Sequence, residues 1–257
     1  MPRPSAVRTI SRAITAGGVS VVFQPIVDIA HGTVFAYESL ARSASFDGPV
    51  ELFDAAVEQR QSGRLGRHLR QLATAACATH PLFLNIHPAE LSEKWLVQLD
   101  DPLFLHEPGT YLEITESVPL SHHDLVKSVL AEVRDKGVGI VVDDLGAGYS
   151  NLSYADLHPE FVKIDRGLVT DLHRDPRRQT LLRGMVRLCE DLGARVVAEG
   201  IESDDELSAA RDAGVAFAQG YHVARPATPP PPPLSSGWPQ APPTKRPSPT
   251  RRRSRLR

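Results

Sequence analysis

Eight short apolar runs, rich in β-branched residues, recur along the chain and alternate with stretches that have helical spacing. Strands that alternate with helices over about 200 residues predict a (β/α)₈ barrel of the TIM type, and a doubly wound open sheet is the alternative. Only residues 30–32 separate the first two expected strands, which predicts a hairpin and an irregular start to the barrel. The runs cover residues 19–29, 34–40, 82–86, 111–114, 138–142, 161–164, 195–198 and 215–218.

Helix signals lie between these runs. Ser121 and Asp124 have the spacing of a capping box that opens a helix. Gly193 follows an apolar helical pattern at the position of a C-cap, and the acids at 204–206 suit the first turn of another helix. Helices at these places are what a barrel requires between its strands.

The composition of the chain changes near residue 226. Residues 227–257 contain ten prolines and seven Lys+Arg but no acid, whereas residues 1–226 carry 22 basic and 31 acidic groups, a net charge of −9. A proline-rich basic segment buries too little apolar surface to offset the entropy of ordering it. We therefore expect a barrel domain over residues 1–226 and a disordered tail over residues 227–257. A partner of that tail would be a nucleic acid, an anionic membrane or a protein.

The composition also indicates in which cellular compartment the protein is located. No apolar stretch approaches the roughly 18 residues that a membrane span needs, and the first residues lack the apolar core of a signal peptide. Cys77 and Cys189 are too few for a disulfide framework. We therefore expect a cytoplasmic protein without a transmembrane segment. The length of 257 residues leaves no room for a fused sensor domain, so we expect control by expression, a partner or dimerisation.

Polar or ionisable side chains end most of the apolar runs. In a parallel barrel the carboxyl ends of the strands meet at one rim, so these side chains would converge. Carboxylates gathered there would repel one another strongly unless cations were bound. Oxygen ligands favour Mg²⁺ or Mn²⁺ over zinc, and two such ions that share a carboxylate are the usual arrangement for phosphodiester hydrolysis. The residues concerned are Glu38, Asn85, Glu113, Asp143, Asp144, Lys163, Glu199 and Gln219.

Each of these positions has a simpler interpretation when it is taken alone. A single acid at a strand end is more often a helix cap or a solvated loop residue than a ligand, so only the convergence of several acids indicates a site. Lys163, among the acids, is suited to hold an attacking water or a phosphate oxygen. Arg42, which shares a strand face with Glu38 and Leu40, has the geometry to grip a phosphate.

A second interpretation concerns the glycines that follow Asp144. Gly146 and Gly148 lie between a strand and a helix, as in a dinucleotide-binding turn. Asn151 stands where a third glycine is required, and acids precede the turn where a pyrophosphate would approach. The pattern therefore gives only weak support to a nucleotide cofactor.

Eight motifs follow one another in a fixed order: Phe23-Gln24-Pro25-Ile26, Glu38-Ser39-Leu40-Ala41-Arg42, Leu84-Asn85-Ile86-His87, Glu113-Ile114-Thr115-Glu116, Asp143-Asp144-Leu145-Gly146-Ala147-Gly148-Tyr149-Ser150, Lys163-Ile164-Asp165, Ala198-Glu199-Gly200-Ile201-Glu202 and Gln219-Gly220-Tyr221. The whole set resembles the EAL domain, a family of bacterial phosphodiesterases that linearise cyclic di-GMP. The resemblance runs from about residue 8 to residue 226. It depends on the combination, because no single motif is specific.

The resemblance implies a role for each matching residue. One metal ion would be held by Glu38, Asn85, Glu113 and Asp143, and Asp143 would bridge to a second ion at Asp144. Glu199, assisted by Lys163, would act as the general base or position the attacking water. The dinucleotide would contact Gln24, Leu40, Arg42 and Gln219. A loop that couples metal binding to dimerisation would include Glu116, Gly146 and Gly148.

Three features depart from the family pattern. Ser39 replaces an alanine of the signature, and Leu145 and Ala147 replace a phenylalanine and a threonine of the loop. The stretch between Arg42 and Asn85 is also shorter than in the family. None of these changes removes an implied catalytic side chain, so we expect a metal-dependent phosphodiesterase that hydrolyses cyclic di-GMP to linear pGpG. The alternative, which rests on the loop changes, is a weak or inactive EAL module that acts as a cyclic di-GMP receptor or an interaction partner.

Overall fold

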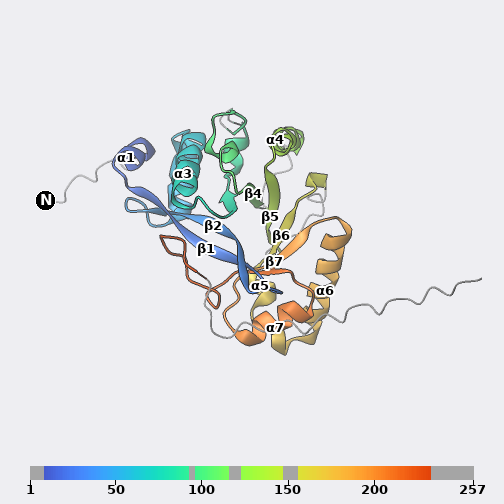
Figure 1. Cartoon of the computed structure of the whole chain (residues 1–257). Helices are drawn as coiled ribbons and strands as arrows, with labels where there is room; N and C mark the ends of the chain where they lie inside the picture. The colour runs from blue at the N-terminus through green and yellow to red at the C-terminus, as the bar shows by residue number, and fades with distance from the viewer. Residues whose placement is uncertain (1–8, 93–95, 116–122, 147–155, 233–257) are drawn as a thin grey trace, which may run out of the picture.

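The computed structural model describes residues 9–92, 96–115, 123–146 and 156–232, in which eight strands close into a barrel in chain order (Figure 1). The closed barrel confirms the predicted fold class and excludes an open, doubly wound sheet. The strands are β1 (Val19–Asp28), β2 (Thr33–Ser43), β3 (Leu82–Asn85), β4 (Thr110–Thr115), β5 (Gly139–Leu145), β6 (Phe161–Ile164), β7 (Arg195–Ala198) and β8 (Phe217–Ala218).

Strand β1 runs antiparallel to both of its neighbours, β2 and β8, whereas the pairs from β2 through β8 are parallel. The predicted hairpin between the first two strands is therefore confirmed. Because β1 is reversed, its carboxyl end lies beside the start of β8, where Asp28 pairs with Phe217. At the opposite end of the barrel, where the parallel strands have their carboxyl ends, β1 contributes Gln24 from its middle. Gln24 pairs there with Glu38 of β2.

Helices connect the strands and cover the barrel. Asp175 caps α6, because its carboxylate accepts hydrogen bonds from the amides of Arg177 and Arg178. Gly193 follows the same helix with a φ of 86°, a left-handed conformation that glycine adopts freely, as the sequence predicts for a helix end. Within the described residues, no helix has both the length and the apolar character needed to span a membrane. The α-helices are α1 (Ile10–Thr15), α2 (Pro49–Glu58), α3 (Ser62–Ala76), α4 (His123–Asp135), α5 (Arg166–Val169), α6 (Pro176–Asp191) and α7 (Asp204–Asp212), and the 3₁₀ helices are η1 (Pro88–Ser92), η2 (Pro102–Phe104) and η5 (Leu172–Arg174).

Aromatic side chains fill the amino-terminal end of the barrel. The Phe161 ring lies at their centre, with its centroid 5.2 Å from that of Phe83, 5.1 Å from Tyr111 and 5.4 Å from Phe217. The guanidinium of Arg195 stacks on Phe161, with 4.2 Å between its Cζ and the ring centroid. This packing closes one end of the barrel and leaves the opposite mouth to the polar side chains.

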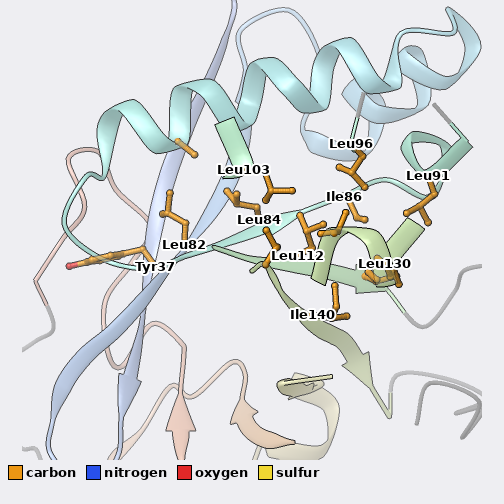
Figure 2. Close-up of a cluster of buried hydrophobic side chains, with 14 of the residues drawn as sticks. Tyr37, Leu82, Leu84, Ile86, Leu91, Leu96, Leu103, Leu112, Leu130 and Ile140 are labelled. Carbon is orange, nitrogen blue, oxygen red and sulfur yellow. The ribbon is translucent and has the colours of Figure 1, made fainter. Parts of the chain in front are cut away.

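Aliphatic side chains pack between the barrel and its helices. Leu82, Leu84, Leu112 and Ile140 project from consecutive strands into one cluster, which Leu130 of α4 covers (Figure 2). A second cluster joins β6 and β7 to α6 and α7. Burial of these side chains is the main favourable contribution to the stability of the barrel.

The chain forms no helix between β8 and residue 232, the last described residue. It runs back along β1 instead (Figure 1), where the amide of Ala227 donates to the carbonyl of Phe23 at 3.0 Å and the amide of Phe23 donates in return at 2.8 Å. The first six residues of the expected tail thus lie against the barrel. Residues 233–257 lie outside the described part, so the disorder of the tail and the domain division at residue 226 stay predictions.

Candidate active site

The ammonium of Lys163 lies at the centre of the carboxyl-terminal mouth. Strand β6 carries this side chain into the barrel, where it is 1% exposed. Its Nζ lies 2.7 Å from Glu199 Oε1, 3.0 Å from Glu113 Oε1, 3.2 Å from Asp143 Oδ1 and 3.4 Å from Glu38 Oε2. The structure therefore brings together four acids from four parts of the chain, in or directly after β2, β4, β5 and β7, as the sequence predicts.

Side-chain amides surround the carboxylate of Glu38. Asn85 Nδ2 donates to Glu38 Oε1 at 2.9 Å, and Gln219 Nε2 donates to Glu38 Oε2 at 2.5 Å. Gln219 Nε2 also lies 3.1 Å from Gln24 Oε1, and Gln24 Nε2 donates to the carbonyl of Ala224 at 3.2 Å. Residues predicted to bind metal and residues predicted to bind substrate thus belong to one hydrogen-bonded network.

An irregularity at the end of β5 brings two consecutive acids into the mouth. In a regular strand, consecutive side chains point to opposite faces. Here the pairing with β6 shifts register between Val142 and Leu145, and Asp144 has a left-handed φ of 61°, which aspartate tolerates better than most residues. Carboxylate oxygens of Asp143, Asp144 and Glu199 consequently lie within 4.8 Å of one another.

The mouth holds more negative charge than one ammonium neutralises. Burial raises the pKa of Glu113 well above its usual range, and the neighbouring carboxylates of Glu38 and Asp143 add to that shift. Burial also raises the pKa of Glu199 to about 8, against the attraction of the Lys163 ammonium. Burial would lower the pKa of Lys163, but the surrounding carboxylates raise it well above its ordinary value. A bound cation would relieve this imbalance.

The donor set of the mouth fits a hard divalent cation. Apart from contacts with Lys163, both carboxylate oxygens of Glu113 and Oδ1 of Asp143 are buried without a hydrogen-bond partner among the described residues. Buried acceptors of this kind normally have a partner, and a metal ion is one. The available ligands are carboxylate and amide oxygens, which suit Mg²⁺ or Mn²⁺ better than zinc.

Two hollows adjoin Glu38, and the residues predicted to bind substrate line them. Gln24, Leu40 and Gln219 line the first, next to Glu199. Arg42 lines the second together with Leu40 and Asn85, and its Nη1 donates to the carbonyl of Ala41 at 2.8 Å. Both hollows therefore adjoin the acidic centre, and Glu38 and Leu40 line each of them.

Four residues in the first hollow have no role in the prediction from sequence. Arg166 forms an ion pair with Glu202 at 3.0 Å, and Asp165 lies beside them. Tyr221 is 47% exposed, and the guanidinium of Arg225 lies 4.2 Å from the centroid of its ring. The four of these side chains that line this hollow, Asp165, Arg166, Glu202 and Tyr221, each come two or three positions after a predicted site residue. This closeness along the chain is the signal by which the sequence could have indicated them.

The loop residues implied in dimerisation are described only in part. Glu116 and Gly148 lie outside the described residues, as does Ala147. Gly146 follows β5 with a φ of 101°, and a Cβ there would lie 2.5 Å from Leu168 Cδ1. Their coupling role stays a prediction.

The fold and the mouth define a class of protein: a (β/α)₈-type barrel whose carboxyl-terminal rim holds a buried lysine among acids suited to divalent cations. The chain belongs to the EAL domain family, whose model matches residues 7–226. The family resemblance stated from the motifs is therefore confirmed.

The curated relatives of the chain include named phosphodiesterases. Over 244 residues the chain is 34% identical to the cyclic di-GMP phosphodiesterase PA2567 of Pseudomonas aeruginosa, which covers 86% of this chain and 40% of that protein. It is 28% identical to the probable cyclic di-GMP phosphodiesterase PdeG of Escherichia coli, over 85% of this chain and 46% of that protein. The chain thus spans less than half the length of these relatives.

Solved structures with the same fold contain the dinucleotide. The calcium/cyclic di-GMP complex of Klebsiella pneumoniae BlrP1 superimposes with a TM-score of 0.73 at 31% identity, over 82% of this chain and 56% of that chain. The cyclic di-GMP-bound form of a standalone EAL protein from Vibrio cholerae O395 has a TM-score of 0.73 at 26% identity, over 82% of this chain and 93% of that chain. The described barrel is therefore similar to proteins that bind this ligand.

Proposed function

We propose that this chain is a metal-dependent phosphodiesterase that hydrolyses cyclic di-GMP to linear pGpG. One observation carries the proposal: the buried Lys163 ammonium lies within 3.4 Å of four carboxylates, and two of these, Glu113 and Asp143, retain buried oxygens without a hydrogen-bond partner among the described residues. Such a set of oxygens supports metal binding, and the named phosphodiesterases among the relatives support the substrate.

Metal ions would occupy two adjoining positions in this proposal. Residues that would hold the first ion are Glu38, Asn85, Glu113 and Asp143. Asp143 would also reach the second ion, at Asp144, because their carboxylate oxygens lie within the same 4.8 Å cluster. When bound, Mg²⁺ or Mn²⁺ supplies positive charge to the phosphate and lowers the pKa of an attacking water.

The side chains of the protein would position the substrate and move one proton. Glu199 would accept a proton from the water whose oxygen adds to phosphorus, while the bond from that phosphorus to the 3′ oxygen breaks and the leaving oxygen is protonated. Lys163, 2.7 Å from Glu199 Oε1, would orient that carboxylate and stabilise charge on the phosphate. The dinucleotide would be held by Gln24, Leu40, Arg42 and Gln219, which line the two hollows.

A cleavage assay tests this function. The purified chain, incubated with cyclic di-GMP and Mg²⁺ or Mn²⁺, should form pGpG that chromatography resolves. Glu199→Gln should abolish the product because it removes the proton acceptor, whereas Glu190→Gln, an exposed change on α6, should leave the rate unchanged. Wild-type rates in Glu199→Gln would contradict the assigned role.

A second candidate is a cyclic di-GMP receptor or interaction module that does not cleave its ligand. The observation that favours it is Leu145, which ends β5 beside the acids where the family has a phenylalanine. Tight binding without any cleavage in either metal would select this alternative. We favour the enzyme because every predicted ligand within the described residues lies at the mouth.

Three further expectations belong to the same proposal. A homodimer would be coupled to the site through Glu116, Gly146 and Gly148, and size-exclusion chromatography with and without metal tests this. The basic tail would bind a nucleic acid, a membrane or a protein, if it has a partner. The protein would act in the cytoplasm, where cyclic di-GMP serves as a second messenger.

A further inference from the structure

We propose that residues 227–232 act as a strap on the edge of β1 that holds the substrate-binding side of the mouth in place. This inference rests on the proposed function, because it concerns the residues assigned there to the dinucleotide.

The strap covers an edge of β1 that β8 leaves open. Strand β8 pairs with β1 only at Val27 and Asp28, so the preceding part of that edge has no partner in β8. Ala227 occupies part of it through its two reciprocal hydrogen bonds with Phe23. The hydroxyl of Thr228 donates to the carbonyl of Val21 at 2.6 Å. An open strand edge exposes unpaired backbone groups, and the strap satisfies several of them.

Prolines prevent the strap from becoming a new edge. Residues 229–232 are all proline, and proline carries no amide hydrogen for a further strand to accept. The strap therefore ends the sheet on this side. A chain that returned along β1 without prolines would instead offer its own donors to a neighbouring molecule.

A buried tyrosine attaches the far end of the strap. The hydroxyl of Tyr37 donates to the carbonyl of Pro231 at 3.0 Å. Its ring packs edge-on against Phe23, at 6.5 Å between centroids and 85° between planes. Figure 2 shows the Tyr37 ring at the border of the aliphatic cluster, with its hydroxyl pointing away from the leucines. Tyr37 thus contacts both the strap and the strand residue that the strap pairs with.

The attachment points lie next to the substrate-binding network. Gln24 follows Phe23, and its side chain is held by the carbonyl of Ala224 and by Gln219 Nε2. Residues 219–226 lead directly into the strap, so the strap fixes the carboxyl-terminal end of this segment to β1. A ligand that meets preorganised groups binds more tightly, because less ordering is needed on binding. Loosening the strap should therefore weaken dinucleotide binding without removing a contact group.

The test uses full-length variants that lose only hydroxyl groups. The double variant Tyr37→Phe with Thr228→Val removes two donors, and we expect the Kd for cyclic di-GMP, measured by calorimetry in Ca²⁺, to rise about threefold to tenfold. Thr180→Val is the matched control, because the hydroxyl of Thr180 donates to the carbonyl of Pro176 on the exposed face of α6. The Kd of this variant for cyclic di-GMP should equal that of wild type. Ala227→Pro, which removes the amide that donates to Phe23, should act in the same direction as the double variant.

Hydrogen exchange without nucleotide gives a second readout. Amides of residues 219–225 should exchange faster in the double variant than in wild type, and faster exchange together with a higher Kd supports the strap. An unchanged Kd or unchanged exchange in a folded variant overturns it. A wild-type chain that does not bind cyclic di-GMP overturns the proposed function instead, and that result is read from the wild type alone.

Discussion

Gln219 donates its side-chain amide to Glu38 across the closure of the barrel, with 2.5 Å between Nε2 and Oε2, although the two residues are 181 positions apart in the chain. Gln219 follows β8 and Glu38 belongs to β2, so the reversed strand β1 lies between them. Gln24 of β1 accepts from the same amide nitrogen. The closure of the barrel thus joins a predicted metal ligand to two predicted substrate contacts.

Replacing Gln219 tests whether this network serves the ligand. Gln219→Leu removes the amide, so Glu38 Oε2 and Gln24 Oε1 lose a donor. We expect the Kd for cyclic di-GMP to rise about tenfold or more, since a buried hydrogen bond to a charged group contributes about 1.5–3 kcal/mol. Calorimetry measures this, and circular dichroism verifies the fold. A folded variant with wild-type affinity would contradict the assignment of Gln219.

Lys163 should stabilise the metal-free protein as the internal counter-ion of the mouth. Lys163→Met leaves its carboxylates buried without a cation, and we expect the free energy of unfolding in EDTA to fall by about 3–5 kcal/mol. Divalent ions should then raise the melting temperature more in the variant than in wild type, because they relieve a larger repulsion.

The control for that change is Lys127→Met, which breaks a surface pair with Asp156 and should have little effect. Equal stability of Lys163→Met and wild type in EDTA would show that the carboxylates of the mouth do not depend on the ammonium.

A buried ion cluster around Arg70 of α3 should contribute more to the free energy of unfolding than the surface pair beside it. Arg70, 2% exposed, donates to both carboxylate oxygens of Asp101 at 2.9 Å and to Glu90 at 2.8 Å. Arg70→Met leaves two buried carboxylates without their counter-ion, and we expect the free energy of unfolding to fall by about 3–5 kcal/mol. Arg67→Met, one turn earlier on the same helix, breaks the contacts with the exposed Asp100 and should lower the free energy of unfolding far less.

Denaturant titration of the two variants measures this difference. The comparison is internally matched, because both substitutions remove one arginine from α3 and keep a long apolar side chain. Comparable losses of stability in the two would rule out a special contribution of the buried cluster.

Glu206 should contribute to acid sensitivity. Burial would raise the pKa of its carboxyl, but hydrogen bonds from the amides of Asp171 and Glu202 hold it below the usual value. A lowered pKa in the folded state stabilises the protein above the unfolded pKa, and this contribution is lost as the pH falls through the folded value. Wild type should therefore lose stability between about pH 5 and 3 more steeply than Glu206→Gln.

Thermal melts across that pH range test this prediction. Asp212→Asn, at the carboxyl end of α7, is a control that removes an acid without disturbing these amides. A Glu206→Gln variant whose acid slope equals that of wild type would contradict the role of the carboxylate.

The strands could be predicted because each combines a β-branched apolar run with a polar end. Residues 161–164 and 195–198 are strands over the predicted ranges, and the hairpin follows from the short link at 30–32. The predicted run at 215–218 is a strand only at Phe217–Ala218, because pairing with β1 is limited to those two residues. The convergence of acids at the mouth follows from the same topology.

Other features depend on tertiary geometry that the sequence pattern does not carry. The register shift that brings Asp144 to the same side of the strand as Asp143 cannot be recognised from the alternation of apolar and polar residues in the sequence. Arg70 and its partner acids come from α3, η1 and η2, and a lone arginine on a helix is normally solvated. The composition of residues 227–232 likewise gives no sign of their pairing with Phe23.

The position of Mn²⁺ in crystals of the protein, measured by anomalous diffraction, tests most directly whether the mouth of the barrel binds metal. We expect one peak against Glu113 and Asp143, and a second on the side of Asp144. A crystal grown in Mn²⁺ that shows no peak at this mouth would contradict the proposed metal site.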